Sequence, residues 1–354
     1  MSDSIKQKAL QDIKQKKIRD AVQYKQNKEK LEKYIEADRV KQDLNNVDLT
    51  TDWLQQKIQA EEDSDARDNA VPFLFSEASD FVQLSAGSLA VFLAATGTGK
   101  STFSANIAHH LKSCGKRTLI IVNEERSFDM GARIACLDLG VDIHKYKKKG
   151  ALPKTVKQQV FDHMATFGDL VTVIGLDFKG NSKLVTSPEG MDQLLTVAQG
   201  KYDAILIDYY QNVNYSINNP NATTWEAMEK FSHSLDKHKN TVDCPIMLFA
   251  QVRRGEEYYK DRIEGRKIVL NKATDVFEIQ VDKKNQRSAI LCHKDRWLGN
   301  HGEDMFVGYD KGKFVPYTPA FEDEVRRKQI DALSSMVDED TGVTDVALDE
   351  GKAD

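Results

Sequence analysis

The amino-acid sequence predicts an α/β fold in which helices flank a mostly parallel, twisted sheet. Between about Phe73 and Pro316, short apolar runs alternate with amphipathic stretches, as parallel strands joined by crossover helices require. The first apolar run leads through a Gly-rich loop into a helical stretch, Thr102–Lys112, which is the pattern of a phosphate-binding loop. Beyond Asp275 the runs are linked by short turns, which indicates an antiparallel extension of the sheet.

Individual elements follow from the same patterns. Ser187 before Pro188 has the form of a helix N-cap followed by Pro at the first helical position. Thr223 with Glu226 fits a capping box at the start of another helix. The parallel strands are expected at Leu89–Leu93, Arg117–Val122, Val171–Ile174, Ala204–Ile207 and Ile246–Ala250. The antiparallel strands are expected at Val276–Val281, Ser288–His293, Met305–Gly308 and Phe314–Val315.

Composition limits the class of protein. The 354 residues are 40% hydrophobic, which is enough for a substantial core. The net charge of −5 argues against coating nucleic acid through a global positive field but allows a local basic channel. No apolar run approaches the roughly 20 residues that span a bilayer, and the N-terminus has no apolar signal core, so we expect no membrane partner and a cytoplasmic location. Four scattered cysteines favour buried thiols over a zinc ribbon or disulfides.

The segment Ala94–Ser101 carries the strongest motif. Its small residues let the loop curl so that backbone N–H groups point at phosphates, and the following helix N-terminus adds partial positive charge. Lys100 is expected to reach the β- and γ-phosphates of ATP, or of another NTP or dNTP, and Ser101 to bind Mg²⁺. The alternative is a Gly-rich turn with a chance Lys-Ser pair. The predicted nucleotide contacts are Ala94, Thr96, Gly97, Thr98, Gly99, Lys100, Ser101 and Thr102.

Two carboxylates complete the predicted chemistry. Asp208 ends the apolar run Ala204–Ile207, and an acidic residue at a buried strand end is the usual second partner of a Mg²⁺ at a phosphate loop. Glu124 follows the strand after the first crossover helix, where a carboxylate can polarise an attacking water. Glu125 is the alternative base, and a surface acidic pair without a catalytic role is the non-functional alternative.

These residues together resemble the hexameric replicative helicases of the DnaB type, including the helicase halves of phage primase-helicases, which are built on a RecA-like domain. Ile207–Gln211 looks like the family's Ile-Asp-Tyr-Leu-Gln motif, and Gly99–Phe103 looks like its Gly-Lys-Ser/Thr-Thr-Phe segment. The resemblance covers roughly residues 83–316. It implies a RecA-like P-loop NTPase domain at residues 73–318 and supports Glu124 as the base.

The resemblance also assigns roles that local patterns do not. It implies that Gln251 is a phosphate sensor and that Arg296, with Lys294 beside it, reaches the ATP of a neighbouring subunit as an arginine finger in trans. A salt-bridged strand end is the alternative for Arg296. Tyr309 resembles the aromatic residue that stacks on the nucleotide base, with a core tyrosine as the alternative.

Two loops are implied to grip DNA through electrostatic contacts that are indifferent to base sequence. They correspond to Asn214–Thr224 and Arg253–Lys272, although acidic residues interleave in the second loop and a solvated charged loop is the alternative. The predicted DNA contacts are Asn218, Asn219, Arg253, Arg254, Lys260, Arg262, Arg266 and Lys267.

The flanking segments have no counterpart in the helical collar of the DnaB proteins or in the primase half of the phage enzymes. Residues 1–48 are expected to form a charged helical arm, either solvated and partly disordered or used for docking or oligomerisation. Residues 49–72 are expected to form a short helix that carries Trp53, and the resemblance implies that it is the linker helix that packs on the adjacent subunit. Residues 319–354 are expected to form a disordered acidic tail that either solubilises the chain or docks on a basic partner.

The function implied by the resemblance is an ATP-driven DNA helicase of a phage, located in the host cytoplasm. It is expected to be a homohexamer with single-stranded DNA in its central channel. The arm and the tail are the segments expected to contact a primase, polymerase or loader. The alternatives are a RecA-like recombinase or mediator that forms filaments on single-stranded DNA, and a regulatory RecA-like ATPase.

Overall fold

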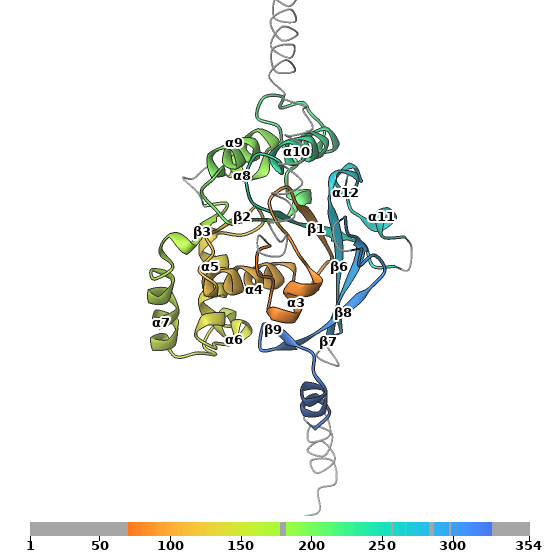
Figure 1. The fold of residues 1–354 in the computed structure, drawn as a ribbon. Coiled ribbons are helices and arrows are strands. Elements are labelled where there is room, and N and C mark those ends of the chain that lie inside the picture. The colour runs from red at the N-terminus through yellow and green to blue at the C-terminus, as the bar shows by residue number, and fades with distance from the viewer. Residues whose placement is uncertain are drawn as a thin grey trace, which may run out of the picture. The chain divides into compact units, whose positions relative to one another are not determined.

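The computed structural model describes residues 70–177, 182–255, 258–265, 267–282, 287–296 and 299–327. Their strands form a single nine-stranded sheet in the order β3-β2-β4-β5-β1-β6-β7-β8-β9 (Figure 1). The six strands β1 to β6 pair in parallel with their neighbours among these six. The strands β7, β8 and β9 continue the sheet from β6 in antiparallel pairs. The α/β architecture with an antiparallel extension is therefore confirmed.

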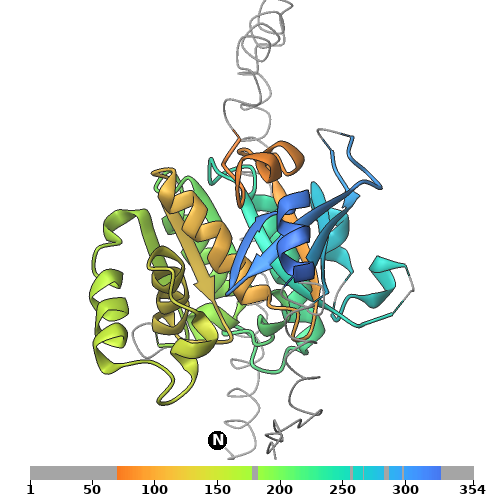
Figure 2. The same cartoon turned by 90° about the horizontal axis from the view of Figure 1, so that it is seen from below.

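The strand predictions hold to within two residues at each end. The parallel strands are β1 (Leu89–Ala95), β2 (Thr118–Val122), β3 (Val171–Ile174), β4 (Ala204–Asp208), β5 (Ile246–Val252) and β6 (Asp275–Asp282). The antiparallel strands are β7 (Arg287–Lys294), β8 (Asp304–Asp310) and β9 (Lys313–Pro316). Figure 2 shows this antiparallel part in blue, at the opposite end of the sheet from α7 (Lys154–Met164).

Helices cover both faces of the sheet because alternate residues of the buried strands point to opposite sides. In β1, Phe92 belongs to one core and Val91 to the other. The first core packs α3 (Ser76–Phe81), α4 (Lys100–Ser113), α5 (Ser127–Asp138), α6 (Ile143–Lys147) and α7 against the sheet. The second packs α8 (Lys183–Thr186), α9 (Pro188–Ala198), α10 (Thr224–His238), α11 (Tyr259–Arg262) and α12 (Ile268–Lys272). Short 3₁₀ turns lie at Gly168–Leu170 and Tyr210–Asn212.

Both predicted helix starts are confirmed. Ser187 Oγ accepts a hydrogen bond from Gly190 N at 3.1 Å, with Pro188 at the first position of α9. At α10, Thr223 N donates to Glu226 Oε2 at 2.7 Å and Glu226 N donates to Thr223 Oγ1 at 3.3 Å. These reciprocal bonds satisfy backbone donors that the helix itself leaves unpaired.

An aromatic cluster fixes α4 against the sheet. The ring of Phe92 stacks on Phe73, Phe249 and Phe277 with centroid separations of 5.5, 5.5 and 5.3 Å. Phe103 of α4 lies over the same cluster, 6.0 Å from Phe92. Such pairs add to the stability that burial of their area provides. The start of α4, where the phosphate loop ends, is held by this packing.

The two ends of the described chain modify the predicted segment boundaries. Val71 forms a β-bridge with Leu84, so the end of the expected linker helix is extended rather than helical. Residues 319–327 are helical and Val325 is buried, so this part of the expected tail is packed rather than disordered. The arm, the Trp53 helix and residues 328–354 lie outside the described residues. In the part of the chain that is described, no helix is both long and apolar enough to cross a bilayer.

Candidate functional site

The candidate phosphate loop connects the end of β1 to the start of α4. Gly97 and Gly99 have φ values of +75° and +94°, in the left-handed region where a side chain would be strained. Thr98 Oγ1 donates to Ala95 O at 2.6 Å, which closes the loop over the strand end. Gly99 is the N-cap of α4, so the unpaired N–H groups of the first turn face the loop. The loop has the curled shape that the sequence predicts.

The loop residues differ in how accessible they are. Thr96 and Gly97 are exposed, whereas Thr98, Gly99, Lys100, Ser101 and Thr102 are half-buried. Ala94 is fully buried in β1, where it pairs with Gln251 of β5 and Ile279 of β6. The prediction that Ala94 contacts the nucleotide is therefore wrong, because the first position of the motif belongs to the sheet.

Asp208 and Ser101 meet at the end of β4. Asp208 is 2% exposed, and its Oδ1 has no hydrogen-bond partner among the described residues. Burial raises the pKa of Asp208 to about 6, although the hydrogen bond with Ser101 and the positive charge of Lys100 act in the opposite direction. A buried, unpaired carboxylate oxygen beside a hydroxyl suits a hard cation such as Mg²⁺.

Ser101 and Asp208 are the two candidate protein ligands for Mg²⁺. Across the described ranges, no three His, Cys, Asp or Glu side chains gather as a metal cluster. Mg²⁺ is commonly held by one or two protein groups together with substrate phosphates and water. The pair Ser101 and Asp208 fits that arrangement. Binding of Mg²⁺ here stays a prediction.

Lys100 lies over the residue that follows Asp208. Its Nζ is 4.7 Å from the centroid of the Tyr209 ring, within the range of a cation–π contact. The ring therefore supports the ammonium group of Lys100 at the end of the phosphate loop. Lys100, Ser101, Asp208 and Tyr209 thus come together from two segments that lie about a hundred positions apart in the sequence.

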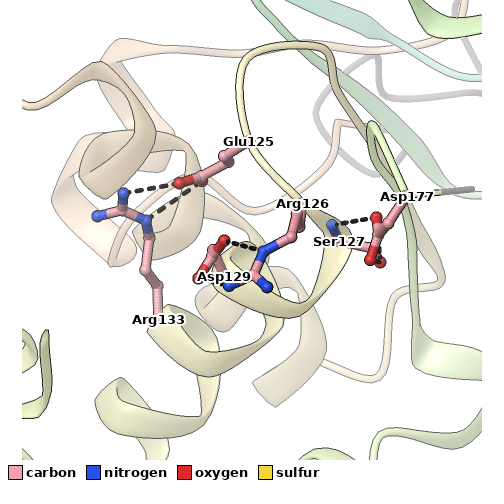
Figure 3. A network of polar contacts seen from close by, with 6 residues as sticks. All are labelled: Glu125, Arg126, Ser127, Asp129, Arg133 and Asp177. Atoms are coloured by element: carbon pink, nitrogen blue, oxygen red, sulfur yellow. Dashed lines mark hydrogen bonds and ion pairs between the residues drawn. The ribbon is translucent and has the colours of Figure 1, made fainter. Parts of the chain in front are cut away.

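The structure distinguishes the two candidate bases after β2. Glu125 forms a bidentate ion pair with Arg133 of α5, with distances of 2.9 and 3.3 Å (Figure 3). Glu124 is exposed and has no hydrogen bond or ion pair with any residue of the described ranges. The geometry favours Glu124 as the base, because Glu125 is already neutralised. Figure 3 shows two further pairs that hold this segment, Arg126 with Asp129 and Ser127 with Asp177.

Gln251, the sensor candidate, lies beside the phosphate-loop strand. Its register partner on β1 is Ala94. Its Nε2 donates to Glu264 Oε2 at 3.0 Å. The side chain of Gln211 bonds both backbone groups of Gln251, at 3.0 and 2.9 Å. Gln251 is thereby connected to the segment after β4 and to the loop that carries Glu264.

Tyr309 lines a cavity of about 470 Å³ next to the phosphate loop. Its hydroxyl lies 3.4 Å from His144 Nε2, and its ring contacts Phe314 edge-on, with centroids 5.2 Å apart. The other residues of the cavity wall include Gly97, Thr98, Gly99, Thr102 and Lys311. This position supports a base-stacking role over a core tyrosine, because the half-buried Tyr309 lines a cavity that also borders the phosphate loop.

The buried side-chain amide of Asn106, which the sequence pattern does not predict, holds the hairpin formed by β8 and β9. This hairpin carries Tyr309 and is called the Tyr309 hairpin below. Asn106 of α4 is 3% exposed. Its Nδ2 donates to Gly312 O at 2.9 Å, and its Oδ1 accepts from Phe314 N at 2.9 Å. Gly312 has a φ of +100°, which only glycine adopts without strain in this turn. An Asn inside an amphipathic helix gives no sign of such a distant partner.

Arg296 and the phosphate loop of the same chain lie at opposite ends of the strands. The phosphate loop follows the carboxyl end of β1, and Arg296 lies near the level where β1 begins. Asp275 pairs with Ala90 near the start of β1, and Lys294 pairs with Val276. Arg296 is exposed, just beyond that point. Lys294 Nζ donates to the carbonyl of Ala273 in the same chain, and burial lowers the pKa of Lys294. Within one chain, therefore, Arg296 does not join the site.

Arg262 is not available to DNA, contrary to the prediction. It is 7% exposed, and its guanidinium donates to both oxygens of Glu278 on β6, at 2.9 and 2.6 Å. His293 Nε2 lies 2.7 Å from Glu278 Oε2. Burial alone would raise the pKa of Glu278, but the hydrogen bonds from His293 and Arg262 lower it to about 2. Charge patterning along a loop does not reveal which arginine turns inward.

The other predicted DNA contacts of this loop lie nearer the surface. Arg253 and Arg254 are exposed. Lys267 is exposed and pairs with Asp261 at 2.5 Å. Lys260 lies over the rings of Tyr258 and Tyr259, at 5.9 and 5.8 Å. Arg266 lies outside the described residues.

The first predicted DNA loop is ordered by a carboxylate from α9. Asn218 and Asn219 are exposed at its tip. Glu189 accepts hydrogen bonds from Ser216 Oγ at 2.6 Å and Ile217 N at 3.0 Å, and it pairs with Lys230 at 2.7 Å. Although burial opposes the change, the hydrogen bonds from Lys230 and Ser216 lower the pKa of Glu189 to about 2. Glu189 therefore stays ionised and holds the loop.

The sheet order, the curled loop after β1 and the acidic end of β4 define a RecA-like P-loop NTPase fold. Residues 79–264, more than half of the chain, match the family model of the DnaB-like helicase C-terminal domain. The chain belongs to this family, which confirms the resemblance to DnaB-type helicases.

Solved structures of low sequence identity share the fold. One solved ATPase domain superposes with a TM-score of 0.61 at 12% identity, covering 77% of this chain and 100% of that one. A DnaB-like replicative helicase, described with its interactions with primase, superposes with a TM-score of 0.58 at 13% identity, covering 77% of this chain and 68% of that one. A comparison with curated protein sequences gave no match.

Proposed function

We propose that this protein is an ATP-driven replicative DNA helicase that assembles as a ring, moves along single-stranded DNA and separates the duplex at a fork. The observation that carries the ATPase part is the hydrogen bond of Ser101 with the buried carboxyl of Asp208, whose Oδ1 has no partner among the described residues. Membership of the DnaB-like family supports the coupling of this site to DNA.

The residues of the site divide the work of hydrolysis. The loop N–H groups and Lys100 bind and orient the triphosphate. Ser101 and Asp208 would hold Mg²⁺, which when bound neutralises charge on the phosphates. Glu124, which has no ion-pair partner in the described part of the chain, accepts a hydrogen bond from water and orients it toward the γ-phosphate. Gln251 contacts the γ-phosphate from the neighbouring strand.

The place of Arg296 supports the proposed ring assembly. Because Arg296 lies at the edge of the sheet opposite to its own phosphate loop, it serves a phosphate loop only on another subunit. A guanidinium supplied in trans stabilises charge on the γ-phosphate and makes hydrolysis depend on the neighbour. A closed homohexamer would place Arg296 of each subunit at the phosphate loop of the next one. It would also turn the exposed DNA-binding candidates toward a strand of DNA in the central channel; these are Asn218, Asn219, Arg253, Arg254 and Lys267.

A forked-duplex assay tests the proposal. With ATP and Mg²⁺, the wild type is expected to separate a fork that has one single-stranded tail, and Lys100→Ala is expected to fail. Testing tails on either strand gives the direction of movement. Electron microscopy with a non-hydrolysable ATP analogue is expected to show closed rings. DNA-stimulated ATP hydrolysis without strand separation, together with open filaments, would instead identify a recombinase-like protein.

A further inference from the structure

Asn123 joins the two strand ends of the candidate site. It follows β2 directly, its side chain is fully buried, and its backbone N donates to Asp208 O at 2.9 Å. Its Nδ2 donates to Tyr209 O at 2.8 Å, and its Oδ1 accepts from Tyr209 N at 2.8 Å. Asn212 Nδ2 donates to the carbonyl of Asn123. All the polar groups of Asn123 therefore bind the segment 208–212.

The side-chain amide of Asn123 adds one pair of hydrogen bonds beyond the end of the ladder between β2 and β4. The parallel ladder of β2 and β4 ends with Val122 opposite Asp208. A side-chain amide offers a donor and an acceptor, as a peptide group does, so Asn123 bridges the strands beyond the end of the ladder. A leucine of similar volume would leave both backbone groups of Tyr209 without these bonds. A carboxylate would accept from Tyr209 N but could not donate to Tyr209 O.

This bridge lies between the groups that carry the proposed chemistry. Glu124 is the next residue after Asn123, and Asp208 immediately precedes Tyr209. The Tyr209 ring supports Lys100 of the phosphate loop. A shift of the Asn123 amide therefore moves the base relative to the metal-binding carboxylate. A misplacement of about 1 Å can lower the rate of an enzyme by about 100-fold.

We propose that Asn123 is a positioning residue that sets the distance and orientation between Glu124 and Asp208. The role rests on the proposed ATPase function of the site. Asn123 acts through the backbone of residues 208–209, because its polar groups are already bound to protein atoms of the segment 208–212.

Nucleotide binding with and without Mg²⁺ tests this role separately from turnover. The probe is a fluorescent, non-hydrolysable ATP analogue, and the variants are Asn123→Leu and Asn123→Asp in the full chain. Without Mg²⁺ both variants are expected to bind the analogue with at most a small loss, because the glycines and backbone N–H groups of the phosphate loop do not contact Asn123 and only the support of Lys100 by Tyr209 can shift. The Mg²⁺ concentration needed for half-maximal enhancement of binding is expected to rise about 10-fold or more. For ATP, kcat is expected to fall by about 100-fold with KM changed far less.

Asn106→Leu is the matched control, because it removes another buried amide that bridges two backbone segments. Since Asn106 holds the Tyr309 hairpin, this change is expected to weaken analogue binding equally with and without Mg²⁺. Wild-type Mg²⁺ dependence and kcat in both Asn123 variants would overturn the proposal. Unfolding of both variants at the assay temperature would also overturn it, because Asn123 would then determine stability alone. A wild type that binds the analogue but does not hydrolyse ATP would refute the ATPase function and leave the binding comparison valid.

Discussion

The carboxyl group of Asp208 combines a functional position with a cost in stability. It is buried at the end of β4, and its Oδ1 has no hydrogen-bond partner within the described ranges. Its pKa is about 6 in the folded protein, compared with 3.8 for an ordinary aspartate. Between pH 3.8 and about 6, Asp208 is therefore mostly protonated in the folded protein and mostly ionised in the unfolded chain.

We expect Asp208→Asn to stabilise the protein in the absence of nucleotide and Mg²⁺ at pH 8, by about 1–3 kcal/mol. The stabilising contribution of the protonated carboxyl is complete below pH 4 and is lost as pH rises through about 6. Thermal unfolding at several pH values measures this. The difference between variant and wild type should shrink toward pH 4. Burial also raises the pKa of Asp275 to about 6. Because Asp275 is present in both proteins, its contribution to the pH dependence of stability cancels in the difference between them. An equal difference at pH 4 and pH 8 would contradict the assignment.

Glu124 and Glu125 are adjacent but have different surroundings. We expect Glu124→Gln to lower ATP turnover by about 10²- to 10⁴-fold, because the amide cannot act as a base. Nucleotide binding should persist. Glu125→Gln is the matched control, because it weakens the ion pair with Arg133 and should affect stability more than turnover. Steady-state ATPase assays and analogue binding distinguish the two. A larger loss of turnover in Glu125→Gln would reverse the assignment.

At the scale of elements, the loop between β5 and β6 contains basic residues of two kinds. Arg262 lies inside, between the two oxygens of Glu278, whereas Arg254 is exposed. Removing one partner of a buried ion pair leaves a buried charge without its main compensation. The exposed arginines remain available for phosphate contacts.

We therefore expect Arg262→Ala to destabilise the protein by about 3 kcal/mol. Arg254→Ala should leave unfolding unchanged, weaken binding to single-stranded DNA of any sequence, and reduce the salt dependence of that binding by about one phosphate contact. Denaturant unfolding and DNA titrations at several salt concentrations measure both effects. Weaker DNA binding at unchanged stability in Arg262→Ala would restore the original prediction for Arg262.

For the whole molecule, the decisive feature is that the two halves of the proposed catalytic site lie at opposite edges of one sheet. The phosphate loop follows the end of β1, and Arg296 lies near the level where β1 begins. A single subunit cannot bring them together without losing the sheet. The role proposed for Arg296 therefore requires a neighbouring subunit.

We expect Arg296→Ala to abolish hydrolysis alone and to regain part of it when mixed with Lys100→Ala. In mixed rings, a Lys100→Ala subunit supplies its arginine to the intact phosphate loop of an Arg296→Ala neighbour. ATPase activity as a function of mixing ratio measures the recovery. Mixing with the double variant Lys100→Ala/Arg296→Ala is the control and should restore nothing. Absence of recovery at every ratio would argue against action in trans.

The positions of the strands along the chain and the phosphate loop were predictable because they depend on local patterns. Apolar runs such as Leu89–Leu93 and caps such as Thr223 with Glu226 depend on residues that are close in the sequence. The site carboxylates Glu124 and Asp208 were predictable from the same source, because carboxyl ends of parallel strands meet at one edge of a sheet. Their actual placement in catalysis stays a prediction.

The sequence by itself determined the succession of strands and helices, the curled loop before Lys100 and the edge of the sheet at which Asp208 lies. Only the tertiary structure decided that Arg262 turns inward, that Ala94 belongs to the sheet, that Arg133 neutralises Glu125, and that Asn123 bridges two strand ends. The reason is physical. Backbone periodicity and caps are set over a few residues. The partner of a polar side chain is set by how the elements pack, whether the partner is 8 residues away, as for Glu125 and Arg133, or 86 residues away, as for Asn123 and Tyr209.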